Sequence, residues 1–263
     1  MPGTDPLDSM KCDAANHDAP ELSVVIACYM EESHLAASVG ELTATLDAMG
    51  RSYELIFIED KSTDGTARVV AELVAQRPAR RAVYHETNQG RGATVAEGFR
   101  LARGRVVGFL DIDLEVHCRH LPMVLTAIDE GADGATALRH YSPGVSANGW
   151  LRKALSRSYR WLFHRCFDAP FEDPETGFKF FVRERILPVV AEAKDHHWFW
   201  DSEIMVLAHL HGLRVVEVPC FFVRRDQKES TVRLLRDVWR YFAAMREFRG
   251  RLRERAKRME LTA

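Results

Sequence analysis

The sequence predicts an α/β fold with a mostly parallel central sheet flanked by helices. Short apolar, β-branched runs alternate with helical stretches from about residue 21 onward, as in folds built from strand–helix units. Hydrophobic residues make up 46% of the chain, which is enough for a sizeable core. The length of 263 residues suits one large domain with small additions.

The first half of the chain has a regular alternation of predicted elements. We expect strands over residues 22–27, 53–58, 81–85 and 105–110, and helices over 33–49, 66–76 and 92–102. The second half is less regular, with helices expected over 147–167 and 200–211 and strands over 177–182 and 214–222. Ligands bind outside the carboxyl ends of parallel strands, so that edge is where chemistry is expected.

Composition narrows the classes of function. The formal net charge is −2, whereas a nucleic-acid-binding protein is usually strongly basic, so we expect no nucleic-acid partner. The five cysteines are scattered, odd in number and without a C-x-x-C pair, which argues against a disulfide framework or a structural zinc site. Reduced thiols in the cytoplasm fit this pattern best.

The two ends of the chain differ in character from the centre. Residues 1–19 are polar, lack the features of a signal peptide and are expected to form a disordered tail before a catalytic domain over 20–230. The longest apolar run, Leu22–Met30, is shorter than the roughly 18–20 residues of a membrane span, so any membrane contact should be peripheral.

Three carboxylates follow the fourth predicted strand at alternate positions. They are Asp111, Asp113 and Glu115, and in an extended backbone they would share one face. Their mutual repulsion would be relieved by a divalent cation, and oxygen ligands suit Mg²⁺ or Mn²⁺. A diphosphate would complete the coordination of the ion. The alternative is a solvated acidic turn without a ligand.

Two further segments at this edge could contact a nucleotide. Asp60 follows the second strand, where a carboxylate can accept hydrogen bonds from a base or a ribose, although helix capping is an alternative in this segment. Asn88-Gln89-Gly90-Arg91-Gly92 precedes the third helix, and its glycines would let an anion approach the helix N-terminus. The segment is not a G-x-G-x-x-G dinucleotide fingerprint, which argues against a nicotinamide dehydrogenase.

Together these segments resemble the family 2 glycosyltransferases, which have the GT-A nucleotide-diphospho-sugar transferase fold. The nearest branch is that of dolichol-phosphate mannose synthase and the polyprenyl-phosphate glucosyltransferases, and the resemblance covers about residues 22–240. The motifs fall in the family's order. They are Ala27-Cys28-Tyr29-Met30-Glu31, Glu59–Thr66, Asn88–Ala93, Asp111-Ile112-Asp113-Leu114-Glu115, Thr176-Gly177-Phe178-Lys179, Asp201-Ser202-Glu203, Glu217-Val218-Pro219, and Arg225 with Ser230.

The resemblance implies a role for each matching residue. The implied nucleotide-sugar contacts are Ala27, Tyr29, Glu31, Ile58, Asp60, Asn88, Gly92, Asp111, Ile112 and Asp113, and the implied metal ligands are Asp111, Asp113 and Glu115. The acceptor phosphate would meet Arg139, Arg152 and Arg225, and the catalytic set would be Asp113, Asp201 and Arg225. Ala27, Met30, Lys61 and Ile112 depart from the family pattern, and no C-terminal membrane domain follows, although many relatives carry one.

The implied activity is an inverting, metal-dependent transfer of a hexose from a nucleotide diphosphate sugar, with UDP favoured over GDP. The expected acceptor is a polyprenyl phosphate, which is already anionic and needs no general base. The alternative is a soluble alcohol or amine, for which Asp201 would serve as the base or, instead, only as a helix N-cap. A non-catalytic module that binds nucleotide sugars or membranes is a further alternative, against which the intact carboxylates argue.

The C-terminal segment, residues 231–263, predicts a basic amphipathic helix. Between Thr231 and Arg258 there are ten Lys or Arg residues against three acids, and apolar residues recur at helical spacing. Such a helix can lie on an anionic membrane surface, which would make the protein peripheral at the cytoplasmic face of a membrane. The alternative is a helix packed on the domain or on a second copy of the chain.

Overall fold

The computed structural model describes residues 19–141, 161–223 and 234–260. Seven strands form one mixed sheet in the order β3-β2-β1-β4-β6-β5-β7. Their bounds are β1 Leu22–Cys28, β2 Tyr53–Glu59, β3 Arg80–Tyr84, β4 Val106–Leu110, β5 Gly134–Tyr141, β6 Phe178–Val182 and β7 Val215–Phe222. The predicted α/β fold with a mostly parallel sheet is therefore confirmed.

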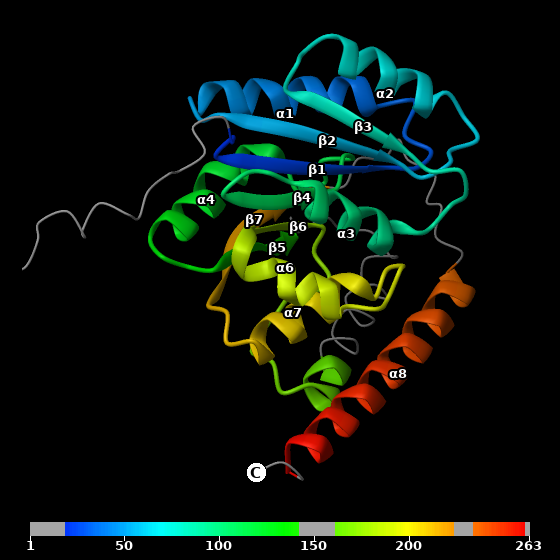
Figure 1. Ribbon diagram of the computed structural model, residues 1–263, viewed down its shortest axis with the longest axis vertical. Helices are drawn as coiled ribbons and strands as arrows, with labels where there is room; N and C mark the ends of the chain where they lie inside the picture. The colour runs from blue at the N-terminus through cyan, green and yellow to red at the C-terminus, as the bar shows by residue number, and fades with distance from the viewer. Residues whose placement is uncertain (1–18, 142–160, 224–233, 261–263) are drawn as a thin grey trace, which may run out of the picture.

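Helices cover both faces of this sheet (Figure 1). One core lies under α1 (Leu35–Ala48), α2 (Thr66–Ala75) and α4 (Leu121–Asp129), the last preceded by a 3-10 turn, η1 (Cys118–His120). The other lies under α3 (Arg91–Leu101), α6 (Arg183–Glu192) and α7 (Trp200–Leu210). Successive residues of a strand enter opposite cores, as Val24 and Val25 of β1 do, which explains why the central strands are mostly apolar.

The antiparallel strand β6 is the feature that builds the site. It runs between β4 and β5, pairing Phe109 with Lys179 and Leu110 with Phe178. The turn before β6 therefore lies beside the residues that leave β4, and the Asp111 amide donates to the Gly177 carbonyl over 2.8 Å. The chain thus brings the acidic segment and the Gly177 segment, which are distant in sequence, to one edge of the sheet.

The long C-terminal helix α8 (Leu234–Glu260) runs diagonally on the side of the sheet that carries α6 and α7 (Figure 1). Met245 and Phe248 on its inner face are buried in the same core as α7. Arg251 also donates to Glu203 of α7 over 2.6 Å. This helix is therefore packed on the domain through the face that carries Met245 and Phe248. Its outer stripe, the face that carries Trp239 and Phe242, is exposed. Among the described residues, no helix is both long and apolar enough to cross a membrane.

Candidate functional site

The acidic segment after β4 forms a turn that divides its side chains between the core and a small pocket. Asp111, Asp113 and Glu115 all line the pocket. Ile112 and Leu114 are buried in the core beneath them. Leu114 takes a positive φ of 53°, and the Glu115 amide donates to Asp113 Oδ1 over 3.2 Å. The backbone is turned rather than extended, yet the three carboxylates reach one pocket, as the alternation predicts.

Two of the residues implied as nucleotide-sugar contacts lie in the core instead. Ile112 is 3% exposed, because the turn directs the residue between the two aspartates beneath the sheet edge. Ile58 is fully buried on the other face, because it alternates with the core residue Phe57 along β2. Neither side chain lines the pocket, and a nucleotide-sugar contact at either residue stays a prediction.

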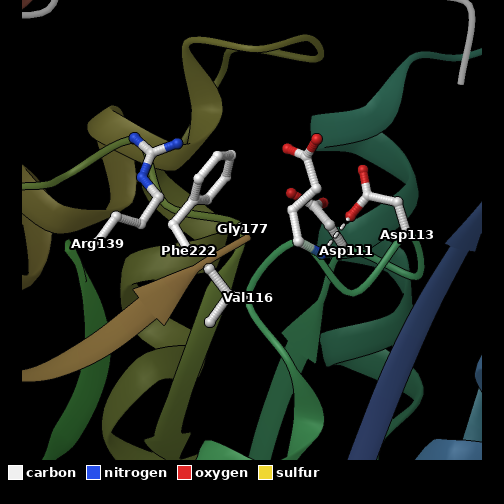
Figure 2. Close-up of a pocket in the computed structure, with 7 residues that line it drawn as sticks. Asp111, Asp113, Val116, Arg139, Gly177 and Phe222 are labelled. Carbon is white, nitrogen blue, oxygen red and sulfur yellow. Dashed lines mark hydrogen bonds between the residues drawn. The ribbon is translucent and has the colours of Figure 1, made fainter. Parts of the chain in front are cut away.

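The opposite wall of the pocket comes from β5 and β7. Figure 2 shows Arg139 and Phe222 on one side and Asp111 and Asp113 on the other. Gly177 forms part of the lining, and a Cβ atom there would lie 1.8 Å from Asp111 Oδ2. A glycine is therefore required at residue 177 for the Asp111 side chain to lie where it does. The pocket presents carboxylates on one wall and a guanidinium on the other.

Arg139 is held in this wall by an acidic loop. Its Nε and Nη2 atoms donate to the two oxygens of Asp173 over 2.7 and 2.6 Å. The Asp173 amide in turn donates to Glu217 Oε1 over 2.7 Å, so the glutamate of the Glu217-Val218-Pro219 motif anchors the loop. Burial raises the pKa of Glu217. The hydrogen bonds that its carboxylate accepts from the Glu172 and Asp173 amides partly offset this rise. Arg152 and Arg225, the other two residues implied to meet the phosphate, lie outside the described residues.

Arg91, at the first position of α3, bridges two carboxylates from different elements. Its Nη2 donates to Asp111 Oδ1 over 2.6 Å and its Nη1 to Asp201 Oδ2 over 2.5 Å. The guanidinium lies 5.2 Å from the Phe109 ring centre and 5.3 Å from that of Trp198. Although burial opposes it, the charges of Asp111 and Asp201 raise the pKa of Arg91, so it is a permanent cation.

Asp201 lies behind Arg91 rather than in the pocket. It is 2% exposed, and its Oδ1 is 3.7 Å from the Nζ atom of Lys179, a fully buried lysine of β6. Burial raises the pKa of Asp201, while Arg91 and Lys179 act against that rise. Burial lowers the pKa of Lys179, which donates to the Thr176 carbonyl. Asp201 does not line the pocket, where a general base would need to meet an acceptor.

Glu175 lies next to this buried cluster on the loop before β6. Burial raises its pKa to about 7, against the opposing influence of Arg139. Its carboxyl group is hydrogen-bonded to Tyr241 of α8. The Tyr241 hydroxyl also lies 2.8 Å from Ser202 Oγ, the residue after Asp201. The C-terminal helix therefore reaches the charged cluster through one tyrosine.

Asp60 organises the loop before α3. Its Oδ1 accepts from the Gln89 amide over 2.7 Å and is 2.6 Å from His85 Nδ1, and its Oδ2 accepts from the Gly90 amide over 2.9 Å. His85 also lies 2.7 Å from Glu97 Oε2. Although burial opposes it, the bonds to Asp60 and Glu97 raise the pKa of His85. Asp60 is 3% exposed, so the partners of its carboxylate are groups of the protein itself.

The glycines of this loop lie against neighbouring segments of the protein. Gly90 has a φ of +95°, and a Cβ there would lie 2.4 Å from His197 Nδ1. At Gly92 a Cβ would lie 2.5 Å from the Cβ of Trp200. Trp200 therefore occupies the space that a side chain at residue 92 would need, and a nucleotide contact at Gly92 stays a prediction. The anion at the start of α3 is the Asp60 carboxylate.

The remaining expected nucleotide contacts lie around the ends of β1 and β2. Tyr29 is exposed, whereas Glu31 is buried with its Oε2 2.5 Å from His34 Nε2. Ala27 is half-buried near the end of β1, and the Asn88 side-chain amide donates to the Asp60 carbonyl over 3.0 Å. None of these residues lines the pocket around Asp113, so the described site does not bring them together with the acidic turn.

Two departures from the family pattern occur where the backbone is unusual. Met30 and Lys61 have φ angles of 61° and 60°, in the left-handed region that asparagine and glycine enter most readily. The family pattern has asparagine and glycine at these two positions. The turns are retained here because Met30 donates its amide to Ser62 Oγ over 3.1 Å and Glu59 accepts the Lys61 and Ser62 amides.

Sequence reasoning assigned no role to Arg91, Lys179, Asp173 or Glu175. Lys179 had a usable signal, because a lysine inside the apolar strand Phe178–Val182 must be buried and therefore paired. The role of Arg91 depends on the contact between the start of α3 and α7. These two segments are 110 residues apart at the Arg91–Asp201 pair, and no local pattern reveals the contact.

Comparison with known proteins bears on what this site does. The profile of Glycosyl transferase family 2 matches residues 23–186, which is more than half of the chain. Glycosyltransferase AglD of Haloferax volcanii is 30% identical over 228 residues, or 86% of this chain and 36% of the relative. The undecaprenyl-phosphate 4-deoxy-4-formamido-L-arabinose transferase of Edwardsiella ictaluri is 28% identical, over 82% of this chain and 64% of the relative. The chain thus spans less than two thirds of either relative.

Solved structures share the fold at low sequence identity. Glucosyl-3-phosphoglycerate synthase from Mycobacterium tuberculosis, in complex with UDP, has a TM-score of 0.65 and 18% identity over 88% of this chain and 80% of that one. The mannosyltransferase PcManGT from Pyrobaculum calidifontis, in complex with GDP-Man and Mn²⁺, has a TM-score of 0.54 and 16% identity over 84% and 60%. Fold, motif order and family profile agree, and the chain belongs to glycosyl transferase family 2.

Proposed function

We propose that this protein is an inverting, metal-dependent glycosyltransferase that moves a sugar from a nucleotide diphosphate, UDP in preference to GDP, to a polyprenyl phosphate. The observation that carries the proposal is the pocket at the exit of β4. Asp111, Asp113 and Glu115 line it together with Arg139. A diphosphate donor and an anionic acceptor both need cationic partners, and this pocket offers a site for a metal ion opposite a fixed guanidinium.

The residues of the acidic turn fit a divalent metal in chemical kind. Carboxylate oxygens are the donors that Mg²⁺ and Mn²⁺ prefer. Among the described residues, no three acidic, histidine or cysteine side chains are grouped closely enough to hold an ion by themselves. Mg²⁺ is commonly bound by one or two carboxylates together with substrate phosphates, so Asp111 or Asp113 with a diphosphate would form a sufficient ligand set.

The relatives support the donor and acceptor classes. One relative is named for transfer involving undecaprenyl phosphate. Solved structures with this fold are described in complex with GDP-Man and Mn²⁺ and with Mn²⁺ and UDP-glucose. Both nucleotides occur among them, so the preference for UDP rests on the sequence resemblance and is the first point to test.

The chemistry proposed is a single displacement at the anomeric carbon. An oxygen of the acceptor phosphate forms the new bond as the bond from sugar to diphosphate breaks, which inverts the configuration. A bound divalent ion would neutralise the charge that develops on the leaving diphosphate. Arg139, fixed by Asp173, would orient the acceptor phosphate, and Arg152 and Arg225 remain predicted partners of that group.

This assignment leaves Asp201 without the role of general base. A phosphate acceptor has no proton to remove at neutral pH, and the Asp201 carboxylate already accepts from Arg91. A soluble alcohol or amine acceptor would instead need a base in the pocket. The identity of the acceptor and the role of Asp201 are therefore linked, and one assay addresses both.

The proposal is tested by transfer of labelled sugar from UDP-sugars and GDP-sugars to undecaprenyl phosphate in detergent with Mn²⁺. We expect a lipid-linked product with wild-type protein and with Glu130→Gln, a surface carboxylate control, and none with Asp113→Asn. Product formed only with alcohols or amines would favour the soluble-acceptor alternative. Failure to release any nucleoside diphosphate would favour a non-catalytic module.

We further propose that the outer stripe of α8 lies on an anionic membrane at its cytoplasmic face. Trp239 and Phe242 are 75% and 44% exposed, and Arg246, Arg253 and Lys257 continue along the exposed side of the helix. Aromatic rings beside basic residues suit the boundary between lipid headgroups and acyl chains. This orientation would present the domain to a lipid-linked acceptor.

Vesicle flotation tests the membrane proposal. We expect binding to vesicles containing anionic lipid, weaker binding at high salt, and loss of binding in Trp239→Ala/Phe242→Ala. Tyr84→Ala removes an aromatic ring of similar exposure on β3 and should leave binding unchanged. Equal binding of both variants, or equal binding to neutral vesicles, would contradict the proposal.

A further inference from the structure

The buried guanidinium of Arg91 already supplies a positive charge to the acidic turn. Its Nε and Nη2 both donate to Asp111 Oδ1, over 3.2 and 2.6 Å. The other oxygen of Asp111 packs against the Cα of Gly177. The Asp111 carboxylate is therefore held at Oδ1 by a cation, while Oδ2 lies close to Gly177.

Arg91 is itself fixed from the other side. Asp201 accepts from Nη1 over 2.5 Å, and the rings of Phe109 and Trp198 flank the guanidinium. The Arg91 side chain is 13% exposed and that of Asp201 only 3%, whereas the side chain of Asp111 is 45% exposed and opens to the pocket. The cation is thus shared between a buried carboxylate and a pocket carboxylate.

We infer that Arg91 is a positioning residue and an internal counter-ion, which holds Asp111 and competes with a divalent metal ion for its carboxylate. Asp201 sets the strength of this competition by drawing the guanidinium away from Asp111. The inference rests on the metal site of the proposed function and extends it to two residues outside the acidic turn. It gives Asp201 a role in controlling metal affinity rather than in accepting a proton.

The physical reason is electrostatic. A divalent ion bound at Asp111 would lie within several Å of the guanidinium, and like charges at that separation repel strongly in a partly buried site. The pocket should therefore bind the free ion weakly and gain affinity when a diphosphate adds negative charge. Neutralising Asp201 should leave the guanidinium to Asp111 alone and weaken metal binding further. Removing Arg91 should strengthen it.

Three proteins with the full chain separate these effects. Asp201→Asn keeps Arg91 and removes the negative charge of its second partner. Arg91→Met/Asp201→Asn removes the buried pair together, because Arg91→Met alone would leave an uncompensated buried carboxylate. Asp113→Asn serves as the variant that lacks a pocket ligand. Circular dichroism and thermal melting establish that each variant is folded before binding is measured.

The measurement is Mn²⁺ binding, followed by the electron paramagnetic resonance signal of the free ion, with and without UDP. Without nucleotide, we expect Asp201→Asn to bind Mn²⁺ about tenfold more weakly than wild type, and Arg91→Met/Asp201→Asn to bind it about tenfold more tightly. With UDP present, the three proteins should keep the same order of Mn²⁺ affinity but differ by smaller factors, because the diphosphate supplies part of the ligand set.

The outcomes distinguish this inference from the proposed function. If wild-type protein binds no Mn²⁺ even with UDP, the metal-dependent function itself is contradicted. If wild-type protein binds Mn²⁺ with UDP but the double variant binds it as weakly as Asp201→Asn, or more weakly, only the role of Arg91 as a competing cation is overturned. An unchanged affinity in both folded variants would also overturn it.

Discussion

Two aspartates that follow neighbouring parts of the same sheet have opposite surroundings. Asp60, after β2, is 3% exposed and accepts hydrogen bonds from the amides of Gln89 and Gly90. Asp113, after β4, lines an open pocket with two other carboxylates. A position directly after a strand therefore does not by itself make an acidic residue a ligand-binding group. What decides is whether backbone amides of the next loop reach the carboxylate first.

The largest expected effect is on catalysis at the open site. Asp113→Asn should lower the rate of sugar transfer by about a thousandfold, because a metal ligand stabilises charge on the leaving diphosphate by several kcal/mol. The free energy of unfolding should change by less than about 0.5 kcal/mol, as is usual for a surface substitution. Steady-state transfer assays and urea denaturation measure the two quantities. If Asp113→Asn were destabilised but still active, Asp113 would have a structural role like that of Asp60, and the contrast between the two aspartates would be contradicted.

The next largest effect is on stability at the buried site. Asp60→Asn should cost about 3 kcal/mol of unfolding free energy, because it replaces an acceptor for two amides and His85 by a group that is half donor. Glu86→Gln, an exposed neighbour, is the matched control. If Asp60→Asn were stable and merely unable to bind nucleotide, Asp60 would contact the ligand rather than the loop.

A smaller effect depends on pH and concerns Glu175, beside the buried Asp201 cluster. The pKa of Glu175 is raised by burial to about 7, so its protonated form is favoured in the folded state. Its contribution to stability is therefore complete below its ordinary pKa near 4.5 and is lost as the pH rises through 7.

Glu175→Gln should remove this dependence, raising stability by about 1–3 kcal/mol at pH 8 and by little at pH 4. Denaturation of wild type and variant at several pH values checks this. Parallel pH profiles for the two proteins would show that Glu175 is not the titrating group.

The smallest effect concerns the turn that follows Asp60 at the end of β2. Lys61 has a φ of 60°, a conformation that costs a lysine roughly 1 kcal/mol more than an asparagine. Lys61→Asn should therefore raise the unfolding free energy by about 0.5–1 kcal/mol. Lys194→Asn, at a residue without a positive φ, is a control that should not stabilise the protein. A loss of stability in Lys61→Asn would indicate that the lysine side chain stabilises the turn.

The parallel half of the fold could be predicted from the sequence because β1, β2 and β4 are almost fully buried and mostly apolar. The expected strands at 22–27 and 53–58 each extend one residue further, to Cys28 and Glu59. No helix was expected at α4 or α6. Pro188 lies inside α6 and weakens its helical pattern, whereas α4 is a short helix of nine residues with Pro122 in its first turn, where proline is tolerated.

The residues of the candidate site could be predicted where they lie in one short segment. They were harder to predict where segments distant in sequence meet. Asp111, Asp113 and Glu115 share a pocket, as their spacing predicts. The family pattern implied nucleotide contacts at Ile58 and Gly92, which the structure buries against the core and Trp200. Long-range packing decides these cases, because local sequence does not specify which face another helix covers.

The binding of UDP with and without Mn²⁺, measured by isothermal titration calorimetry, tests the central claim most directly. We expect wild-type protein to bind UDP only when Mn²⁺ is present, and Asp113→Asn to lose this metal-dependent binding while it remains folded. Binding of equal affinity without the metal, or binding that Asp113→Asn leaves unchanged, would contradict the claim that the acidic turn after β4 anchors the diphosphate through a metal ion.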